Sequence, residues 1–122
     1  MRKIKFRAWD KEEHEMIDGD SWFFGQDELE PFIDTVERAY EYYDLMQYIG
    51  LRDKNGKEGY FSDLVKWGKA VYEIVWNEDD GIAIMRYIKG KEIFKYLRIE
   101  QIKQGEVIGN IYENPELTER QE

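Results

Sequence analysis

Turn-forming residues recur at short intervals between residues 50 and 115 of this chain. Asn55-Gly56, Asp79-Asp80-Gly81 and Asn114-Pro115 separate apolar runs that are too short for long helices. Three of these runs, residues 63–67, 70–77 and 81–88, are rich in β-branched and aromatic side chains, which favour strands. A chain of many short strands without alternating helices is predicted to form a small barrel or a strongly bent sheet.

Two further runs complete this region. The sequence KEIFKYLRIEQI, residues 91–102, is compatible with a strand or with one or two helical turns, whereas EVIGNIY, residues 106–112, reads as a last strand. The barrel hypothesis requires the apolar residues of the strands to be mostly buried. These residues are Val65, Val71, Ile74, Val75, Ile82, Ile84 and Ile111.

The first 44 residues are predicted to add a strand, a hairpin and a short helix. Ile4, Phe6 and Ala8 alternate with polar or aromatic residues, as in a half-buried strand. A turn at residues 18–20 would then lead into an aromatic return strand. Apolar residues spaced by three or four indicate an amphipathic helix over residues 31–43, although the same residues are good strand formers.

Composition limits the class of protein. The 122 residues fit one domain, and 42% hydrophobic residues are too many for a disordered acidic tail. Because the chain has no cysteine, it can form neither disulfides nor a thiolate zinc site, and a cytoplasmic setting is expected. The start of the chain lacks the apolar run of a signal peptide, and no window approaches a membrane span of about 20 apolar residues.

Charge is distributed unevenly along the chain. Residues 10–44 hold 13 acidic and 2 basic residues, a balance of −11, whereas residues 81–105 hold 2 acidic and 6 basic residues, a balance of +4. Two solvated faces would explain this asymmetry. It would also allow the acidic part of one copy to dock against the basic part of another.

The stretch GLRDKNGKE, residues 50–58, has glycines and a lysine in an order similar to a phosphate-binding loop. Five residues rather than four separate Gly50 from Gly56, and Glu58 replaces the hydroxyl residue that would follow the lysine. Asn55-Gly56 instead matches a type I′ hairpin turn, in which both central residues take positive φ. We therefore predict a turn without affinity for phosphate.

Three blocks of sequence together resemble the YopX family of small proteins encoded by phages and prophages. The blocks are IKFRAWD at residues 4–10, LMQYIGLRDKNGKE at residues 45–58 with Asp63 to Lys66 after it, and EVIGNIYENPEL at residues 106–117. The resemblance implies a single domain over residues 1–122. Within it, residues 1–44 would form the N-terminal strand or hairpin with a variable acidic segment, residues 45–117 an SH3-like β-barrel, and residues 118–122 a tail.

The resemblance also implies a mainly β fold, α+β overall, and homo-oligomers in the bacterial cytoplasm, but it implies no established activity. Members of the family usually have a sequence similar to IYEGD at the place where this chain has Gly59-Tyr60-Phe61-Ser62-Asp63. Gly59 and Ser62 depart from that pattern, so the turn before Asp63 is the place where the geometry is expected to differ.

Little in the sequence suggests catalysis or a cofactor. His14, the single histidine, lies among glutamates in KEEHE, where a solvated loop is a better explanation than a metal site. Without cysteine and with few hydroxyl residues, nucleophilic catalysis has little to work with. We expect no enzyme, no cofactor and no bound metal.

A protein–protein interaction module, self-associating or binding a host protein, is the function that the sequence favours. Two alternatives remain: a nucleic-acid-binding accessory protein, which the net charge of −9 opposes, and an acidic DNA mimic that captures a host DNA-binding protein. Residues 86–98 offer a basic and aromatic stretch for the first alternative. The candidate partner-binding residues are aromatic and could equally belong to the core: Trp22, Phe23, Phe24, Trp67 and Trp76.

Overall fold

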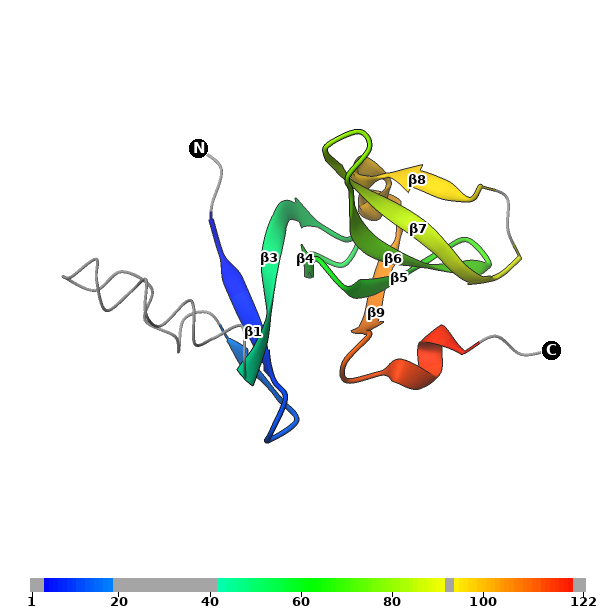
Figure 1. Cartoon of the computed structure of the whole chain (residues 1–122). Helices are drawn as coiled ribbons and strands as arrows, with labels where there is room; N and C mark the ends of the chain where they lie inside the picture. Colours follow the sequence, from blue (N-terminus) through cyan, green and yellow to red (C-terminus); the bar gives the residue numbers. More distant parts are fainter. Residues whose placement is uncertain (1–3, 19–41, 92–93, 120–122) are drawn as a thin grey trace. The chain divides into compact units, whose positions relative to one another are not determined.

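The computed structural model describes residues 4–18, 42–91 and 94–119. The chain divides into two compact units, Ile4–Gln47 and Tyr48–Glu122. Strand β3, Tyr43–Arg52, runs through the boundary and supplies residues to both units. The expected fold class, a mainly β protein with a small barrel-like sheet and short helical segments, is confirmed (Figure 1).

The first unit contains an antiparallel arrangement around β1, Phe6–Asp10. On one side β1 pairs with β2, Glu15–Asp18, and on the other with the first part of β3, where Ala8 lies opposite Leu45. Ala8 is only 1% exposed, as expected for the apolar face of β1, and the other residues of the strand are half-buried. Met46 is also 1% exposed but lies opposite Arg7, so it is buried on the other face of the sheet. Ile4 is exposed, however, and lies before the strand begins.

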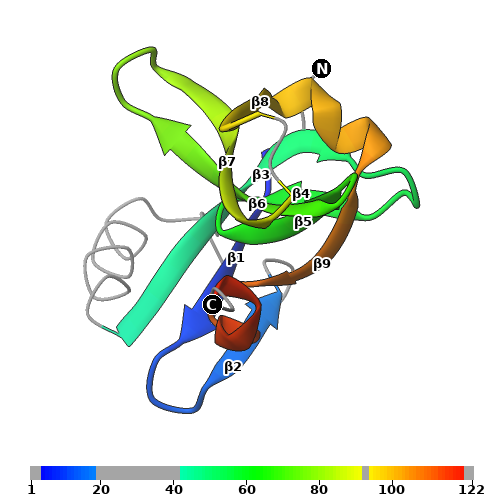
Figure 2. The same cartoon turned by 90° about the vertical axis from the view of Figure 1, so that its right-hand side faces the viewer.

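The second unit is built on a five-stranded antiparallel sheet with the strand order β8-β7-β6-β5-β9. Figure 2 shows β6 and β5 in the middle of this sheet and β9 along one side. The pairing register shifts between Leu64 and Val65 and again between Val71 and Tyr72. Such irregularities bend strands, which suits a strongly curved, barrel-like sheet. The strands are β5, Asp63–Trp67; β6, Ala70–Asn77; β7, Ile82–Gly90; β8, Tyr96–Arg98; and β9, Glu106–Asn110.

Short elements complete this unit. Strand β4, Glu58–Tyr60, pairs with the last part of β3. The ambiguous run at residues 91–102 contains both predicted structures in succession, since β8 leads directly into the 3-10 helix η2, Ile99–Gln104. A second 3-10 helix, η3, Pro115–Thr118, follows β9 and begins at the proline of the Asn114-Pro115 turn signal.

One apolar cluster forms the core of the second unit. Tyr72, Ile74 and Met85 are fully buried at its centre, and each such side chain contributes about 1.5–3 kcal/mol relative to an exposed one. The Tyr72 hydroxyl donates a hydrogen bond to the Phe94 carbonyl at 2.7 Å, so its polar atom is satisfied. The buried members are Ile49, Val65, Ala70, Tyr72, Ile74, Met85, Leu97, Ile102 and Val107.

Several expectations from the sequence need correction. Ile82 was predicted to be buried but is 50% exposed, because it opens β7 beside the β6–β7 turn. Val65, Ile74 and Ile84 are buried as expected, while Val71, Val75 and Ile111 are half-buried.

The first hairpin turns earlier than predicted. Its turn is at residues 11–14, where the Asp10 carboxylate accepts hydrogen bonds from the amides of Glu12 and Glu13. The return strand is therefore β2 and not the aromatic run. The predicted helix at residues 31–43 lies almost wholly outside the described residues, and Tyr43 opens β3.

Candidate functional site

The stretch from Gly50 to Glu58 forms a hairpin turn, as predicted, but of a different type. Gly56 has a φ of +83°, whereas among the described non-glycine residues only His14 and Ser62 have positive φ. Asn55 therefore does not adopt the conformation of a type I′ turn. The Gly56 amide donates to the Asp53 carbonyl at 3.0 Å, and the Asp53 amide to the Lys57 carbonyl at 2.8 Å, which is the pattern of a longer turn closed by a left-handed glycine.

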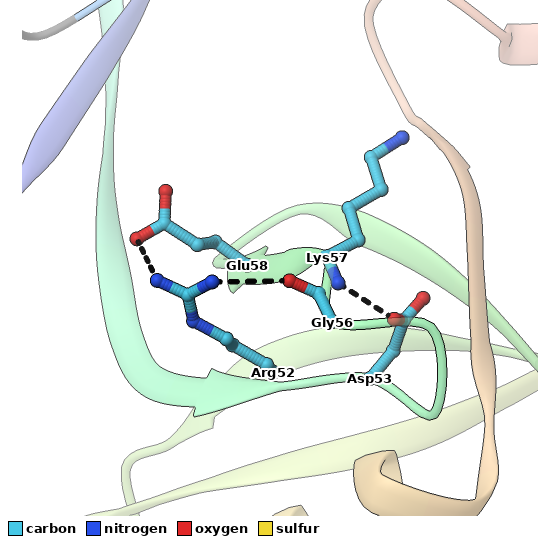
Figure 3. Close-up of polar contacts among 5 residues, drawn as sticks. All are labelled: Arg52, Asp53, Gly56, Lys57 and Glu58. Carbon is cyan, nitrogen blue, oxygen red and sulfur yellow. Dashed lines mark hydrogen bonds and ion pairs between the residues drawn. The ribbon is translucent and has the colours of Figure 1, made fainter.

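Asp53 explains this choice of turn. Its carboxylate accepts hydrogen bonds from the amides of Asn55 and Lys57, both at 2.8 Å, and holds the loop from inside. Figure 3 shows the bond from the Lys57 amide. Burial of Asp53 tends to raise its pKa, but the N–H groups of Val107, Lys57 and Asn55 and the charge of Lys57 outweigh that effect and lower the pKa. A loop in which two amides point at the carboxylate of its own first residue is an architectural turn.

Arg52 lies on the outside of the same turn. Its guanidinium donates to the Gly56 carbonyl at 3.3 Å and lies 3.9 Å from the Glu58 carboxylate (Figure 3). The Arg52 guanidinium thus faces acceptors within the turn.

Two other polar residues, from the blocks of sequence that resemble the YopX family, are also buried. Asp63 is 1% exposed and accepts from the Tyr60 amide at 2.9 Å. Asn110 is 5% exposed, and its side-chain oxygen accepts from the amides of Tyr112 and Glu113. These side chains stabilise loops, as expected for buried polar groups, and are not available to a ligand.

Exposed apolar side chains concentrate in one part of the second unit. Among the described residues, six large hydrophobic side chains are exposed: Ile4, Tyr42, Trp76, Ile82, Phe94 and Tyr96. Four of the six lie within residues 76–96, on the β6–β7 hairpin or in and just before β8. Trp76 and Tyr96 are 55% and 59% exposed, and exposure of that size in aromatic residues is typical of contact surfaces.

The register of the strands brings two arginines to the same surface. Arg86 lies directly opposite Tyr96, and Ile84 lies opposite Arg98. Because alternate residues of a strand share a face, all four side chains are on one face of the sheet, while Met85 and Leu97 point into the core. We call this set, Ile84, Arg86, Tyr96 and Arg98, the β6–β8 face. Trp76 lies opposite Ala83 and therefore points to the other face of the sheet, at the end of β6.

A groove of about 660 Å³ follows the β6–β8 face. Glu78, Asp79 and Asp80 of the β6–β7 turn line one part of it, and Arg86 and Arg98 line another. Arg86 also forms an ion pair with Glu73 at 3.2 Å, so one of the two guanidinium groups is already partly neutralised. The groove therefore combines aromatic, acidic and basic groups, a mixture that suits contact with protein better than contact with a uniformly charged polymer.

The structure places the predicted partner-binding residues in different environments. Trp76 lies in the groove, whereas Trp67 is half-buried, packs against the core and contacts the Phe94 ring with centroids 6.3 Å apart. Trp22, Phe23 and Phe24 lie outside the described residues. The sequence identified the basic and aromatic stretch but gave no sign that Ile82 and Phe94 would be exposed beside it.

His14 lies at the end of the first hairpin turn, exposed and stacked on Trp9 with ring centroids 6.1 Å apart. In the part of the chain that the structure describes, no group of three or more His, Asp or Glu side chains is placed to hold a metal ion. No helix of that part is long and apolar enough to cross a membrane.

Taken with the groove, the fold defines a small, mainly β protein with a mixed aromatic and charged surface. The family model described as YopX protein matches residues 5–119, and the chain belongs to the YopX family. Protein EF1440 from Enterococcus faecalis has a similar crystal structure, with a TM-score of 0.61 and 26% identity over 98% of this chain and 100% of that one. No curated protein matches the chain.

Proposed function

We propose that this protein is a non-catalytic protein–protein interaction module that self-associates, and that the β6–β8 face is its main contact surface. The observation that carries this proposal is the concentration of exposed large hydrophobic side chains within residues 76–96. Tryptophan, tyrosine and arginine dominate binding energy at protein interfaces, and Trp76, Tyr96 and Arg98 all line the groove.

The charges of the groove favour a protein partner over a nucleic acid. Phosphate groups would meet Glu78, Asp79 and Asp80 at one part of the groove, where they would be repelled. A folded protein surface can present basic groups to that part and carboxylates to Arg98. Charge alone would be screened at physiological salt, over a Debye length of about 8 Å, so burial of the aromatic rings has to supply most of the affinity.

Mass measured by light scattering after gel filtration tests this proposal. We expect the wild-type protein at about 100 μM, a concentration above many oligomer dissociation constants, to have a mass well above 14.8 kDa that largely survives moderate salt. Tyr96→Ala and Trp76→Ala should each reduce this mass. A monomeric wild-type protein would overturn self-association.

Tyr42 provides a matched control for Tyr96. It is the same residue type, is 54% exposed, and lies in the other unit. Tyr42→Ala should leave the mass unchanged. If Tyr42→Ala dissociated the assembly and Tyr96→Ala did not, the β6–β8 face would not be the contact surface.

A second candidate function is binding of single-stranded nucleic acid, favoured by the pairing of Arg86 with Tyr96 and the nearby Arg98. Fluorescence anisotropy with a labelled oligonucleotide at about 50 and 200 mM salt separates the two functions, because phosphate contacts lose affinity steeply over that range. Tight binding that Arg86→Ala and Arg98→Ala abolish would favour this candidate. The DNA-mimic hypothesis depends on residues 10–44, most of which lie outside the described residues, and it stays a prediction.

We infer the biological setting from the family resemblance: a phage or prophage protein acting in the cytoplasm of a bacterial host, where the partner is a second copy or a host protein. Affinity purification from lysogenic cells, with wild-type bait compared with Tyr96→Ala bait, tests this setting. Host proteins recovered only by the wild-type bait would support a host partner.

A further inference from the structure

Strand β8 forms one edge of the five-stranded sheet and is only three residues long. Its partner β7 pairs with it through Arg86 and Tyr96, Met85 and Leu97, and Ile84 and Arg98. The described strands leave the other side of β8 without a neighbour. An open strand edge presents main-chain N–H and C=O groups that can pair with another strand.

The hydrogen bonds of β7 show which groups of β8 point outward. The Tyr87 amide donates to the Lys95 carbonyl at 2.9 Å, and these two residues are opposite each other when the register of the two strands is continued. In an antiparallel pair, hydrogen-bonded and non-hydrogen-bonded positions alternate. Lys95 and Leu97 therefore direct their main-chain groups toward β7, and Tyr96 and Arg98 direct theirs away from it.

Two copies of this edge are complementary to each other. When two β8 strands are placed antiparallel with Leu97 opposite Leu97, Tyr96 of each copy lies opposite Arg98 of the other. Both residues are outward-pointing, so in each pair the Arg98 N–H can donate to the Tyr96 carbonyl of the other copy, and the Tyr96 N–H can donate to the Arg98 carbonyl. The Arg98 carbonyl also accepts the first hydrogen bond of η2, for which Arg98 is the N-cap, so the second bond of each pair is shared. A two-fold axis requires such a self-complementary edge.

The side chains fit the same register. Tyr96 would lie between Arg86 of its own chain and Arg98 of the second copy, with guanidinium groups on both sides of one phenol ring. Glu73, which is paired with Arg86, ends this row on one side, and Ile84 of the second copy continues it on the other. No two like charges are directly opposite across the new pair, so no cross-strand repulsion opposes it.

We propose that two copies of this protein pair edge to edge through β8, with Leu97 on the two-fold axis, to join their five-stranded sheets. The proposal rests on the proposed self-association and specifies its geometry. Because three residues provide only a few main-chain hydrogen bonds, the pairing has to draw on the neighbouring groove and to depend on concentration.

Arg98→Pro is the sharpest test. Arg98 has a φ of −63° and a ψ of 146°, values that proline adopts without strain, and its N–H points away from β7. The substitution therefore removes one outward donor and blocks the edge while leaving the β7–β8 pairing intact. Arg98→Ala is the matched control, since it removes the guanidinium but keeps the donor.

We expect Arg98→Pro to raise the dissociation constant of the dimer at least about tenfold and Arg98→Ala to raise it less. The wild type and both variants are compared by light scattering over a dilution series, with circular dichroism to check folding. A folded Arg98→Pro protein with wild-type mass would overturn edge pairing and leave self-association standing. A monomeric wild type would overturn both.

Cysteine cross-linking tests the register and does not depend on the proline variant. The chain has no cysteine, so Tyr96→Cys and Arg98→Cys proteins each carry a single thiol. After the two are mixed and mildly oxidised, the cross-link between Cys at position 96 and Cys at position 98 should exceed either homodimer, because only that pair lies directly opposite. Cross-links at the frequency of random pairing would overturn the register.

Discussion

The carboxylate of Asp53 accepts a hydrogen bond from the main-chain N–H of Val107, 54 positions further along the chain, at 2.8 Å. The same side chain organises the β3–β4 turn through the amides of Asn55 and Lys57. One buried acid thus joins a local turn to the first part of β9. Its charge is shared among three N–H donors, which is why it tolerates burial.

Asp53→Asn should lower the free energy of unfolding by about 2–3 kcal/mol at pH 7, because an amide accepts more weakly and brings N–H groups of its own toward these donors. Urea unfolding monitored by tryptophan fluorescence measures the loss. A difference below about 0.5 kcal/mol would contradict the assigned role.

The stabilisation by Asp53 should also depend on pH. The pKa of Asp53 in the folded protein lies below the ordinary value of 3.8, so its contribution is complete well above pH 3.8 and is lost as the pH falls through the folded pKa. The difference in unfolding free energy between wild type and Asp53→Asn should therefore narrow between about pH 5 and pH 2. Subtracting the two proteins removes the titration of the other acidic groups, and a constant difference would argue against the lowered pKa.

Ser62→Gly should stabilise the protein by about 0.5–1 kcal/mol. Ser62 has a φ of +75°, which costs a residue with a side chain about 1–2 kcal/mol, partly offset by the greater freedom of glycine in the unfolded chain. Its amide donates to the Ile74 carbonyl and its carbonyl accepts from the Ile111 amide, so the backbone is fixed in this conformation. Thermal unfolding checks the sign, with Ser62→Ala, which keeps a Cβ, as the control that should not stabilise.

Gly59→Ala should destabilise the protein by about 1–3 kcal/mol through overpacking. A Cβ at Gly59 would lie 2.6 Å from Cδ1 of Ile102, which is fully buried. Ile102→Val removes that methyl group and should relieve much of the clash. A double-mutant cycle measures the coupling, and purely additive effects would show that the two positions do not compete for space.

Arg86→Ala and Trp76→Ala should each change the free energy of unfolding by less than about 1 kcal/mol. The Arg86–Glu73 ion pair is exposed on the arginine side, and such pairs contribute little. Trp76 is 55% exposed and contacts the Phe61 ring with centroids 6.3 Å apart. Chemical denaturation of both variants checks this expectation, and larger losses would mean that these residues serve the fold more than a surface.

The middle strands could be predicted from the sequence because local signals agree there. Residues 63–67, 70–77 and 81–88 combine strand-forming side chains with a turn signal at Asp79-Asp80-Gly81, and β5, β6 and β7 coincide closely with these runs. The departure of Ser62 from the family pattern also marked a real feature of the turn, since this serine adopts the left-handed conformation that glycine favours. At Gly59, Ile102 occupies the space that a larger residue would need.

Turn positions were harder to predict because they depend on contacts that sequence patterns do not show. The turn at residues 11–14 is stabilised by the Asp10 side chain. A single aspartate is a weaker sequence signal for a turn than the Asp18-Gly19 pair, where the turn was predicted. The β3–β4 turn is set by Asp53, whose third partner is the distant Val107. The composition of the surface was hard to predict for the same reason, because only the cross-strand register shows that Arg86 and Tyr96 are neighbours.

Strand β3 restricts how this chain can be divided or exchanged. The boundary between the two compact units falls at Gln47 and Tyr48, inside a ten-residue strand whose first half pairs with β1 and whose last half pairs with β4. A chimera that swaps the N-terminal unit for that of a relative would have to match side chains on both halves of one continuous strand. An exchange that ends before Tyr43 leaves both pairings of β3 within one sequence, so Tyr43 is the last point at which such a chimera keeps the junction of the two units intact.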